Sequence, residues 1–238
     1  MAGDRRASEA TLPSPAAPWT ARQLLAAAAV LALLAIAALA IDLPVARWVS
    51  GLKLPGDVRR LIALAEVFGW GGSVAIFILT AATLDPRGWR VAPRLMLCAW
   101  GAGLTADGLK LIGLARWRPS AALAANLTET FAGWLPLLRH DPALGPYGYL
   151  LQSFPSGHAA TATGLAIGLS TLYPRGRWLF FACAGLACLQ RVQALAHFPS
   201  DILAGAGLGC LISAICVAKS PLQKWLTRLE STDFKSET

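Results

Sequence analysis

The chain has 238 residues, of which 55% are hydrophobic and only 14% are charged, and its formal net charge is +8. Soluble domains average about 25% charged residues, so this composition is typical of an integral membrane protein. The positive charge does not indicate a nucleic-acid partner, because the sequence has no Lys/Arg-rich stripe with interleaved aromatic residues. The cations stand instead at the ends of apolar runs, where lipid headgroups are expected.

The N-terminal segment 1–20 is polar and rich in Ala, Ser and Pro, and we expect a disordered cytoplasmic tail. The uncharged run 23–41 that follows is long enough to cross a bilayer. A signal peptide is the alternative, because Ala38-Leu39-Ala40 resembles a cleavage site. The apolar run is longer than the roughly 7–15 residues of a signal-peptide core, so we expect a retained anchor.

Further apolar runs complete a predicted membrane domain over residues 21–218. The expected spans after the first are 61–84, 91–114, 157–174, 177–196 and 199–218. The connection 115–155 is long enough to contain short helices, and we expect its His140 to be solvated. Residues 219–238 form an expected cytoplasmic C-terminal tail. The predicted fold is an all-α, six-helix transmembrane bundle with a partly helical outer loop between helices 3 and 4.

The basic residues predict that both termini are cytoplasmic. The segments that would then lie inside carry Arg5, Arg6, Arg22, Arg87, Arg90, Arg94, Arg175, Arg177, Lys219, Lys224 and Arg228. The outer segments also hold several cations, so the excess of basic residues on the inner side becomes clear only if some of the outer cations bind a substrate. The five cysteines form no Cys-x-x-Cys pair and no Cys/His cluster, and we expect free thiols and no metal site.

Ionisable residues within membrane spans are costly and therefore mark functional candidates. They gather in Lys110 with the RWRPS segment 116–120, in the PSGH segment 155–158, and in the QRVQALAHFPSD segment 190–201. Each cluster stands at the outer end of a predicted span, so the topology brings all three to one membrane face. Asp107 lies three residues before Lys110 and is its expected partner, whereas Glu66 is expected to be a buried hydrogen-bonding group.

All three clusters contain groups that can bind phosphate. Lys110, Arg118 and Arg191 can neutralise its charge, and an arginine can hold two oxygens at once. Ser156 and Gly157 precede an apolar helix, and the free N–H groups at a helix start bind anions. The absence of a side chain at Gly157 allows a close approach.

The remaining polar residues can perform the chemistry. His197 stands four residues before Asp201, so the carboxylate can orient the imidazole and make it a nucleophile. His158 is then the acid that protonates a departing alkoxide. Arg116 has two open interpretations, a lipid-headgroup anchor or a residue behind the phosphate ligands. Together the clusters predict a phosphatase that needs no metal.

These motifs resemble those of the type 2 phosphatidic acid phosphatase (PAP2) superfamily, which includes membrane lipid phosphatases and vanadium haloperoxidases. The family pattern is Lys-x6-Arg-Pro, Pro-Ser-Gly-His and Ser-Arg-x5-His-x3-Asp. Here it reads Lys110-x7-Arg118-Pro119, Pro155-Ser156-Gly157-His158 and Arg191-x5-His197-x3-Asp201. The first motif is one residue longer than in the family, and Gln190 stands in the Ser position of the third.

The resemblance implies a membrane enzyme without a cofactor, in which His197 attacks phosphorus to form a phosphohistidine. Asp201 would orient the other ring nitrogen, and His158 would protonate the leaving group. The expected substrate is a lipid phosphate monoester or diphosphate: undecaprenyl diphosphate, a lipid A phosphate, phosphatidylglycerol phosphate or phosphatidic acid. The expected location is a bacterial inner membrane, with the site facing the periplasm. A phosphotransferase acting on a lipid alcohol is the alternative, and an anion or lipid transporter is less favoured.

Overall fold

The protein is mostly helical in the computed structural model, which describes residues 19–135, 138, 143, 146–217 and 221–231. The α-helices are α1 (Ala21–Ala38), α2 (Asp42–Gly51), α3 (Gly56–Leu64), α4 (Gly71–Leu84), α5 (Ala92–Ile112), α6 (Pro119–Ala122), α7 (Gly157–Leu172), α8 (Arg177–Gln193), α9 (Pro199–Val217) and α10 (Pro221–Ser231). Short 3-10 helices are η1 (Ala65–Phe68), η2 (Gly88–Val91), η3 (Thr128–Thr130), η6 (Pro146–Leu151) and η7 (Pro174–Gly176). The predicted all-α class is confirmed.

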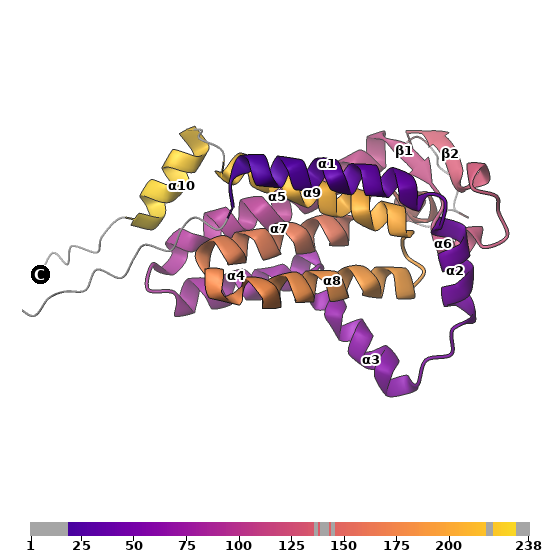
Figure 1. Cartoon of the computed structure of the whole chain (residues 1–238), viewed down its shortest axis with the longest axis horizontal. Coiled ribbons are helices and arrows are strands. Elements are labelled where there is room, and N and C mark those ends of the chain that lie inside the picture. The colour runs from indigo at the N-terminus through magenta and orange to yellow at the C-terminus, as the bar shows by residue number, and fades with distance from the viewer. Residues whose placement is uncertain (1–18, 136–137, 139–142, 144–145, 218–220, 232–238) are drawn as a thin grey trace, which may run out of the picture.

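Helix α7 occupies the centre of the bundle, where it packs against α5, α8 and α9, and α1 lies along α9 (Figure 1). Small residues allow this burial, because they let neighbouring backbones approach closely. A Cβ atom at Gly164 of α7 would lie 2.0 Å from the Cys98 carbonyl oxygen of α5. At Gly209 of α9 it would lie 2.7 Å from Cβ of Thr163. Side chains at these positions would force the central helices apart.

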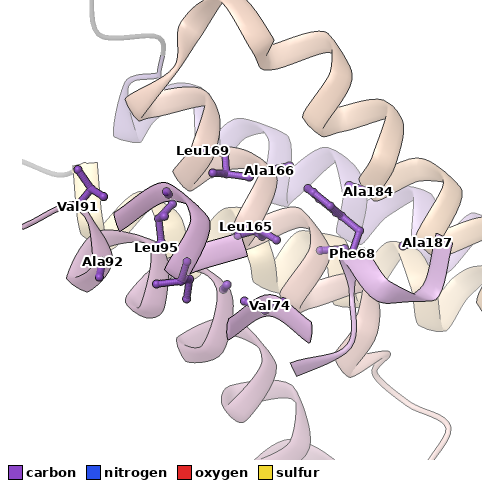
Figure 2. Close-up of a cluster of buried hydrophobic side chains, with 14 residues drawn as sticks. Phe68, Val74, Val91, Ala92, Leu95, Leu165, Ala166, Leu169, Ala184 and Ala187 are labelled. Atoms are coloured by element: carbon purple, nitrogen blue, oxygen red, sulfur yellow. The ribbon is translucent and has the colours of Figure 1, made fainter. Parts of the chain in front are cut away.

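A hydrophobic core fixes α4, α5 and α8 around α7. Figure 2 shows Val74 of α4, Leu95 of α5 and Leu165 of α7 in this cluster, with Phe68 from η1 beside them. Val74, Leu95 and Leu165 are fully buried. Because interior side chains are close-packed, this core sets the distance between the helix ends that carry the polar clusters.

The structure breaks the predicted second span 61–84 into two helical segments. The segment Gly56–Phe68 meets α4 at an angle of 68°. The Ser73 hydroxyl caps the bend by donating to the Val67 and Trp70 carbonyl oxygens. Kinks of this size occur where backbone hydrogen bonds are diverted. The bend places Glu66 beside the polar clusters instead of inside a straight membrane helix.

Among the residues that the structure describes, three helical segments are long and apolar enough to cross a membrane, namely Ala21–Ala38, Gly88–Ile112 and Pro199–Val217, and the bent pair makes a fourth if it crosses once. Helices α7 and α8 have 16 and 17 residues and are shorter than these three segments. The number of six spans therefore stays a prediction. Most of the predicted tail 1–20, and the parts 218–220 and 232–238 of the C-terminal segment, lie outside the described residues, as does His140.

The connection before α7 contains a two-stranded antiparallel sheet that the sequence did not predict. Strand β1 (Leu114–Arg116) pairs with β2 (Phe131–Trp134), and the register shifts between Ala115 and Arg116. Helix α6 and this sheet lie at the end of the bundle opposite α10 (Figure 1). Ser153 donates its N–H to the Arg116 carbonyl oxygen at 3.1 Å, which joins the sheet to the segment before α7.

Candidate active site

A cavity of about 460 Å³ lies where the ends of α5, α7 and α8 meet η1. Its lining includes Asp107, Lys110, Arg118, Gly157, His158, Arg191 and His197 from the predicted set, together with Glu66. Three other predicted residues, Arg116, Ser156 and Asp201, have no exposed surface and lie among the side chains behind the lining. The structure thus brings the three sequence clusters together.

His197 lies in the turn between α8 and α9 with only 2% of its surface exposed. Its Nδ1 is 2.7 Å from the carbonyl oxygen of Ser153, and because a carbonyl only accepts, Nδ1 carries the hydrogen. Nε2 is then the nitrogen with a free lone pair. Burial first, and then the charges of Arg118, Lys110 and Arg191, lower the pKa of His197 well below its usual value of 6.5. The ring is therefore neutral and nucleophilic at neutral pH.

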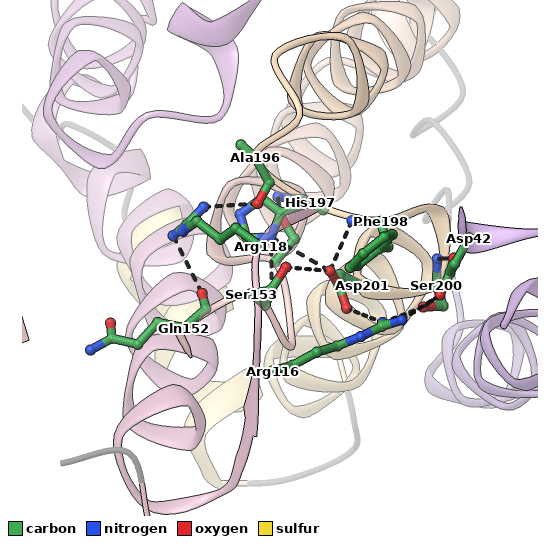
Figure 3. A network of polar contacts seen from close by, with 12 residues as sticks. Asp42, Arg116, Arg118, Gln152, Ser153, Ala196, His197, Phe198, Ser200 and Asp201 are labelled. Atoms are coloured by element: carbon green, nitrogen blue, oxygen red, sulfur yellow. Dashed lines mark hydrogen bonds and ion pairs between the residues drawn. The ribbon is translucent and has the colours of Figure 1, made fainter. Parts of the chain in front are cut away.

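Asp201 does not make the direct hydrogen bond to His197 that the spacing predicts. Its Oδ2 atom is 3.9 Å from Nδ1 and instead accepts from the Ser153 hydroxyl at 2.6 Å and the Phe198 N–H at 2.9 Å (Figure 3). The expectation is corrected because the Ser153 carbonyl lies closer to the ring than the carboxylate does. Asp201 therefore positions His197 indirectly, by fixing the two segments that flank the imidazole.

Arg116 is neither exposed to lipid nor in contact with the cavity. Its guanidinium is fully buried and bridges two carboxylates, Asp201 at 2.6 Å and Asp42 at 2.6 Å (Figure 3). The rings of Phe131 and Phe198 stack on it, with centroids 4.7 and 4.3 Å away. This arrangement excludes the lipid-headgroup anchor and places Arg116 behind the predicted phosphate ligands.

Asp42, at the start of α2, is part of this network and was missed by the sequence analysis. Its Oδ1 accepts from the Ser200 N–H at 3.0 Å, and its Oδ2 accepts from the Ser200 hydroxyl at 2.5 Å. Ser200 also accepts from Arg116 at 2.7 Å. The network therefore ties α2, β1 and the first turn of α9 together beneath His197. The only sequence signal was an acidic residue at the end of the first apolar run.

Arg118 is held by three backbone carbonyls. Its guanidinium donates to Tyr149, Gln152 and Ala196, at distances between 2.9 and 3.3 Å. A guanidinium has five N–H donors, so two remain for a ligand in the cavity. The bond to Ala196 also fixes the turn immediately before His197. Arg118 can thus hold the turn that carries His197 and bind an anion in the cavity at the same time.

Lys110 is 7% exposed, and its ammonium group donates to Asp107 at 2.8 Å, which is the pairing expected from their spacing. Gly157 faces this pair. A Cβ atom there would lie 2.7 Å from Oδ1 of Asp107 and 3.0 Å from Nζ of Lys110. Glycine is therefore required for the lysine to approach the start of α7.

Ser156 caps α7 and differs from its expected role. Its hydroxyl accepts from the Ala159 N–H at 3.3 Å, while its own N–H donates to the Asp201 carbonyl oxygen at 3.0 Å. That N–H is therefore engaged and does not face a ligand. The first-turn N–H groups of Gly157 and His158 are the ones that an α-helix leaves without an internal partner.

Arg191, His158 and Glu66 meet at one side of the cavity. Nη1 of Arg191 donates to Oε1 of Glu66 and lies 3.2 Å from Nε2 of His158, which is 3.3 Å from the same Glu66 oxygen. Glu66 is 38% exposed at its side chain, so the expectation of a buried group is corrected. Among the described residues, Nε of Arg191 is a buried donor without a partner. Arg191 also lines the cavity, so its guanidinium is placed to bind an anion there.

The family model described as the PAP2 superfamily matches residues 92–225, more than half of the chain and all three motifs. The chain belongs to the PAP2 superfamily. Among its relatives, the lipid A 1-phosphatases of Rhizobium johnstonii and Rhizobium etli are each 40% identical to it over 74 residues. These matches cover 30% of this chain and 30% and 32% of the relatives, so the chain spans about a third of the curated relatives it matches.

A solved structure confirms the membrane PAP2 fold. This chain is similar to a transmembrane PAP2-type phosphatidylglycerolphosphate phosphatase from Bacillus subtilis, with a TM-score of 0.55 and 16% sequence identity. The likeness covers 90% of this chain and 99% of that structure. In the part of this PAP2 chain that the structure describes, no three His, Cys, Asp or Glu side chains are grouped to hold a metal ion. The five cysteines are free thiols.

Proposed function

We propose that this protein is a membrane lipid phosphatase that works through a phosphohistidine at His197. The observation that carries the proposal is the state of that ring: buried, neutral, with Nδ1–H held by Ser153 and Nε2 left for the substrate. Lys110, Arg118 and Arg191 line the same cavity. A neutral nucleophile beside several cations suits attack on a phosphate anion.

The reaction follows from the positions of the groups. Lys110, Arg118 and Arg191 hold the phosphate oxygens, and Nε2 of His197 attacks phosphorus. The bond from phosphorus to the lipid oxygen breaks, and His158 gives its proton to that oxygen. His158 then accepts a proton from water as the water attacks the phosphohistidine. Inorganic phosphate leaves, and His197 returns to its neutral form.

The cavity also has an apolar side, which favours a lipid over a soluble phosphate. Trp70, Trp100 and Leu104 line it together with the charged groups, and Trp70 and Leu104 are 56% and 71% exposed. Exposed apolar side chains beside a phosphate site suit the chain of a membrane lipid. Since two relatives are named lipid A 1-phosphatases, a lipid A 1-phosphate is the first substrate to test, before undecaprenyl diphosphate, phosphatidylglycerol phosphate and phosphatidic acid.

The arrangement of charges supports a bacterial inner-membrane protein with a periplasmic site. The cavity is lined by the end of α5 that leads into β1. Helix α10 lies at the end of the bundle opposite β1 and β2 (Figure 1). Arg94 of α5 pairs with Glu230 of α10 at 2.6 Å, so the start of α5 is at the α10 end. The basic turns before α5 and before α8 share that end. Arginine-rich turns mark the cytoplasmic side.

The test is phosphate release by the purified full-length protein in lipid nanodiscs. Each of the four lipid phosphates is supplied with and without excess EDTA, and a lipid alcohol is added in a parallel series to reveal phosphoryl transfer. We expect inorganic phosphate from at least one lipid, unchanged by EDTA. His197→Ala should abolish release, while His140→Ala, which changes a histidine outside the three sequence motifs, should retain it. No release from any lipid, or transfer to the alcohol without release, would contradict the hydrolase.

A further inference from the structure

Glu66 brings a carboxylate into a cavity that is otherwise built to bind an anion. It comes from η1, at the bend between α3 and α4, outside the three sequence motifs. One of its oxygens contacts both Arg191 and His158, and the other accepts from the Gln190 amide at 3.3 Å. The position of Glu66 depends on a close approach between the bend and α7. A Cβ atom at Gly69 would lie 2.8 Å from the His158 carbonyl oxygen, so glycine is what allows the bend to approach the first turn of α7.

His158 and Arg191 lie so close that a proton on the histidine would be repelled by the arginine, and Glu66 is within reach of both groups. The proposed acid must carry a proton on His158, yet Nη1 of Arg191 is only 3.2 Å from Nε2 of that ring. A protonated ring and a guanidinium at this distance are two cations and two donors facing each other. A single carboxylate oxygen has two lone pairs and can accept from both. Lys110 of α5 also lines this cavity and adds a further cation, while its partner Asp107 is 61% exposed and bound to the lysine.

We propose that Glu66 is a positioning residue that holds the ring of His158 beside Arg191 and directs its proton, when the ring carries one, to the leaving group. The inference rests on the proposed phosphatase activity and adds a group that the family motifs do not contain. Glu66 acts through His158, so its removal should matter most when the leaving oxygen needs a proton. A leaving group that departs readily as an anion should bypass it.

The experiment compares two substrates in the purified full-length protein. One is the lipid phosphate that the wild type hydrolyses best, whose alkoxide or sugar oxygen needs a proton. The other is p-nitrophenyl phosphate, whose phenolate leaves without one. For Glu66→Gln we expect kcat on the lipid to fall about 100-fold, within the range of general-acid catalysis, with KM nearly unchanged and a loss on p-nitrophenyl phosphate of less than about 10-fold. Glu66→Asp, which keeps the charge, should recover part of the loss.

A matched control and a double mutant make the result decisive. Glu230→Gln removes a glutamate that pairs with an arginine at the far end of the bundle, Arg94 at 2.6 Å, and should leave both activities unchanged. In a His158→Asn background, Glu66→Gln should add no further loss, because the group it positions is already gone. The comparison of His158→Asn with the double mutant still tests whether Glu66 acts through His158 if the single Glu66 variant is less stable.

Three outcomes would overturn the inference. An equal loss on both substrates would show that Glu66 acts on phosphate binding through Arg191. A lower KM with kcat unchanged would show that it competes with the substrate for that arginine. Losses that add in the double mutant would show that it does not act through His158. Wild-type protein inactive on every phosphate would instead refute the proposed function, and the two failures are therefore distinguishable.

Discussion

The buried network beneath His197 makes Asp42→Asn a sharp test of how the site is supported. Asp42 and Arg116 are both fully buried, and their ion pair spans 2.6 Å. The substitution preserves shape but removes one of the two carboxylates that neutralise Arg116. It also turns an NH₂ group toward donors of Arg116 or Ser200, because an amide has only one accepting oxygen.

The expected cost follows from this burial. Removing one partner of a buried ion pair costs about 3–5 kcal/mol, and we take about 3 kcal/mol because Asp201 still neutralises the guanidinium. For a chain of this length, about 3 kcal/mol corresponds to a fall in Tm of roughly 6–12 °C. Because Asp201 and Ser200 lose part of their support, activity should also fall while KM changes little.

The assay is thermal unfolding in one detergent at a fixed scan rate, followed by tryptophan fluorescence, with phosphate release measured on the same preparation. The matched control is Asp57→Asn, which breaks a surface pair with Arg60 at 3.5 Å whose side chains are 98% and 85% exposed. That change should leave Tm and activity unaltered, because exposed ion pairs contribute little. If Asp42→Asn unfolds within about 2 °C of the wild type, the network does not support the site as described.

Three further predictions concern pH and sidedness. Because the pKa of His197 lies well below 6.5, kcat/KM should stay level as pH falls from about 7 to about 6, and a tenfold decline per unit beginning at 6.5 would refute the neutral nucleophile. The Arg87 hydrogen bond lowers the pKa of Asp85 from 3.8 to about 2. The fall in Tm caused by Arg87→Gln should therefore be full above about pH 4 and vanish toward pH 2, as Asp85 becomes protonated in both proteins. A difference in Tm that persists at pH 2 would contradict this linkage. In spheroplasts, Ser120→Cys should react with an impermeant thiol reagent and Ser231→Cys only after lysis, and the reverse pattern would invert the topology.

The sequence predicted most of the charged residues that line the cavity, because three ordered motifs placed chemically matched groups at the ends of apolar runs. It could not predict the contacts of Asp42 or Glu66. Asp42 meets its partners across separations of 74 and 158 residues, and Glu66 meets Arg191 across 125. Such pairings depend on how α2 and the bend before α4 pack against α9 and α8, which periodicity does not encode.

Two predictions from local spacing differ from the structure. The four-residue step from His197 to Asp201 predicted that the carboxylate orients the imidazole directly, on a helix or in a tight turn. Here α9 begins at Pro199, so His197 sits in the preceding turn and its ring hydrogen reaches the Ser153 carbonyl first. Likewise, the continuous apolar run 61–84 predicted one straight span, but the glycines and Ser73 near its middle permit the bend that delivers Glu66 to the cavity.

The most direct test of the central claim is to trap the covalent intermediate. The wild-type protein and His197→Ala are mixed with a substrate carrying a radioactive phosphate, quenched within milliseconds in alkali, and analysed by peptide mapping. We predict an alkali-stable and acid-labile phosphate on His197 in the wild type and none in the variant. Turnover in the wild type without a labelled His197, or appreciable turnover by His197→Ala, would contradict the phosphohistidine mechanism.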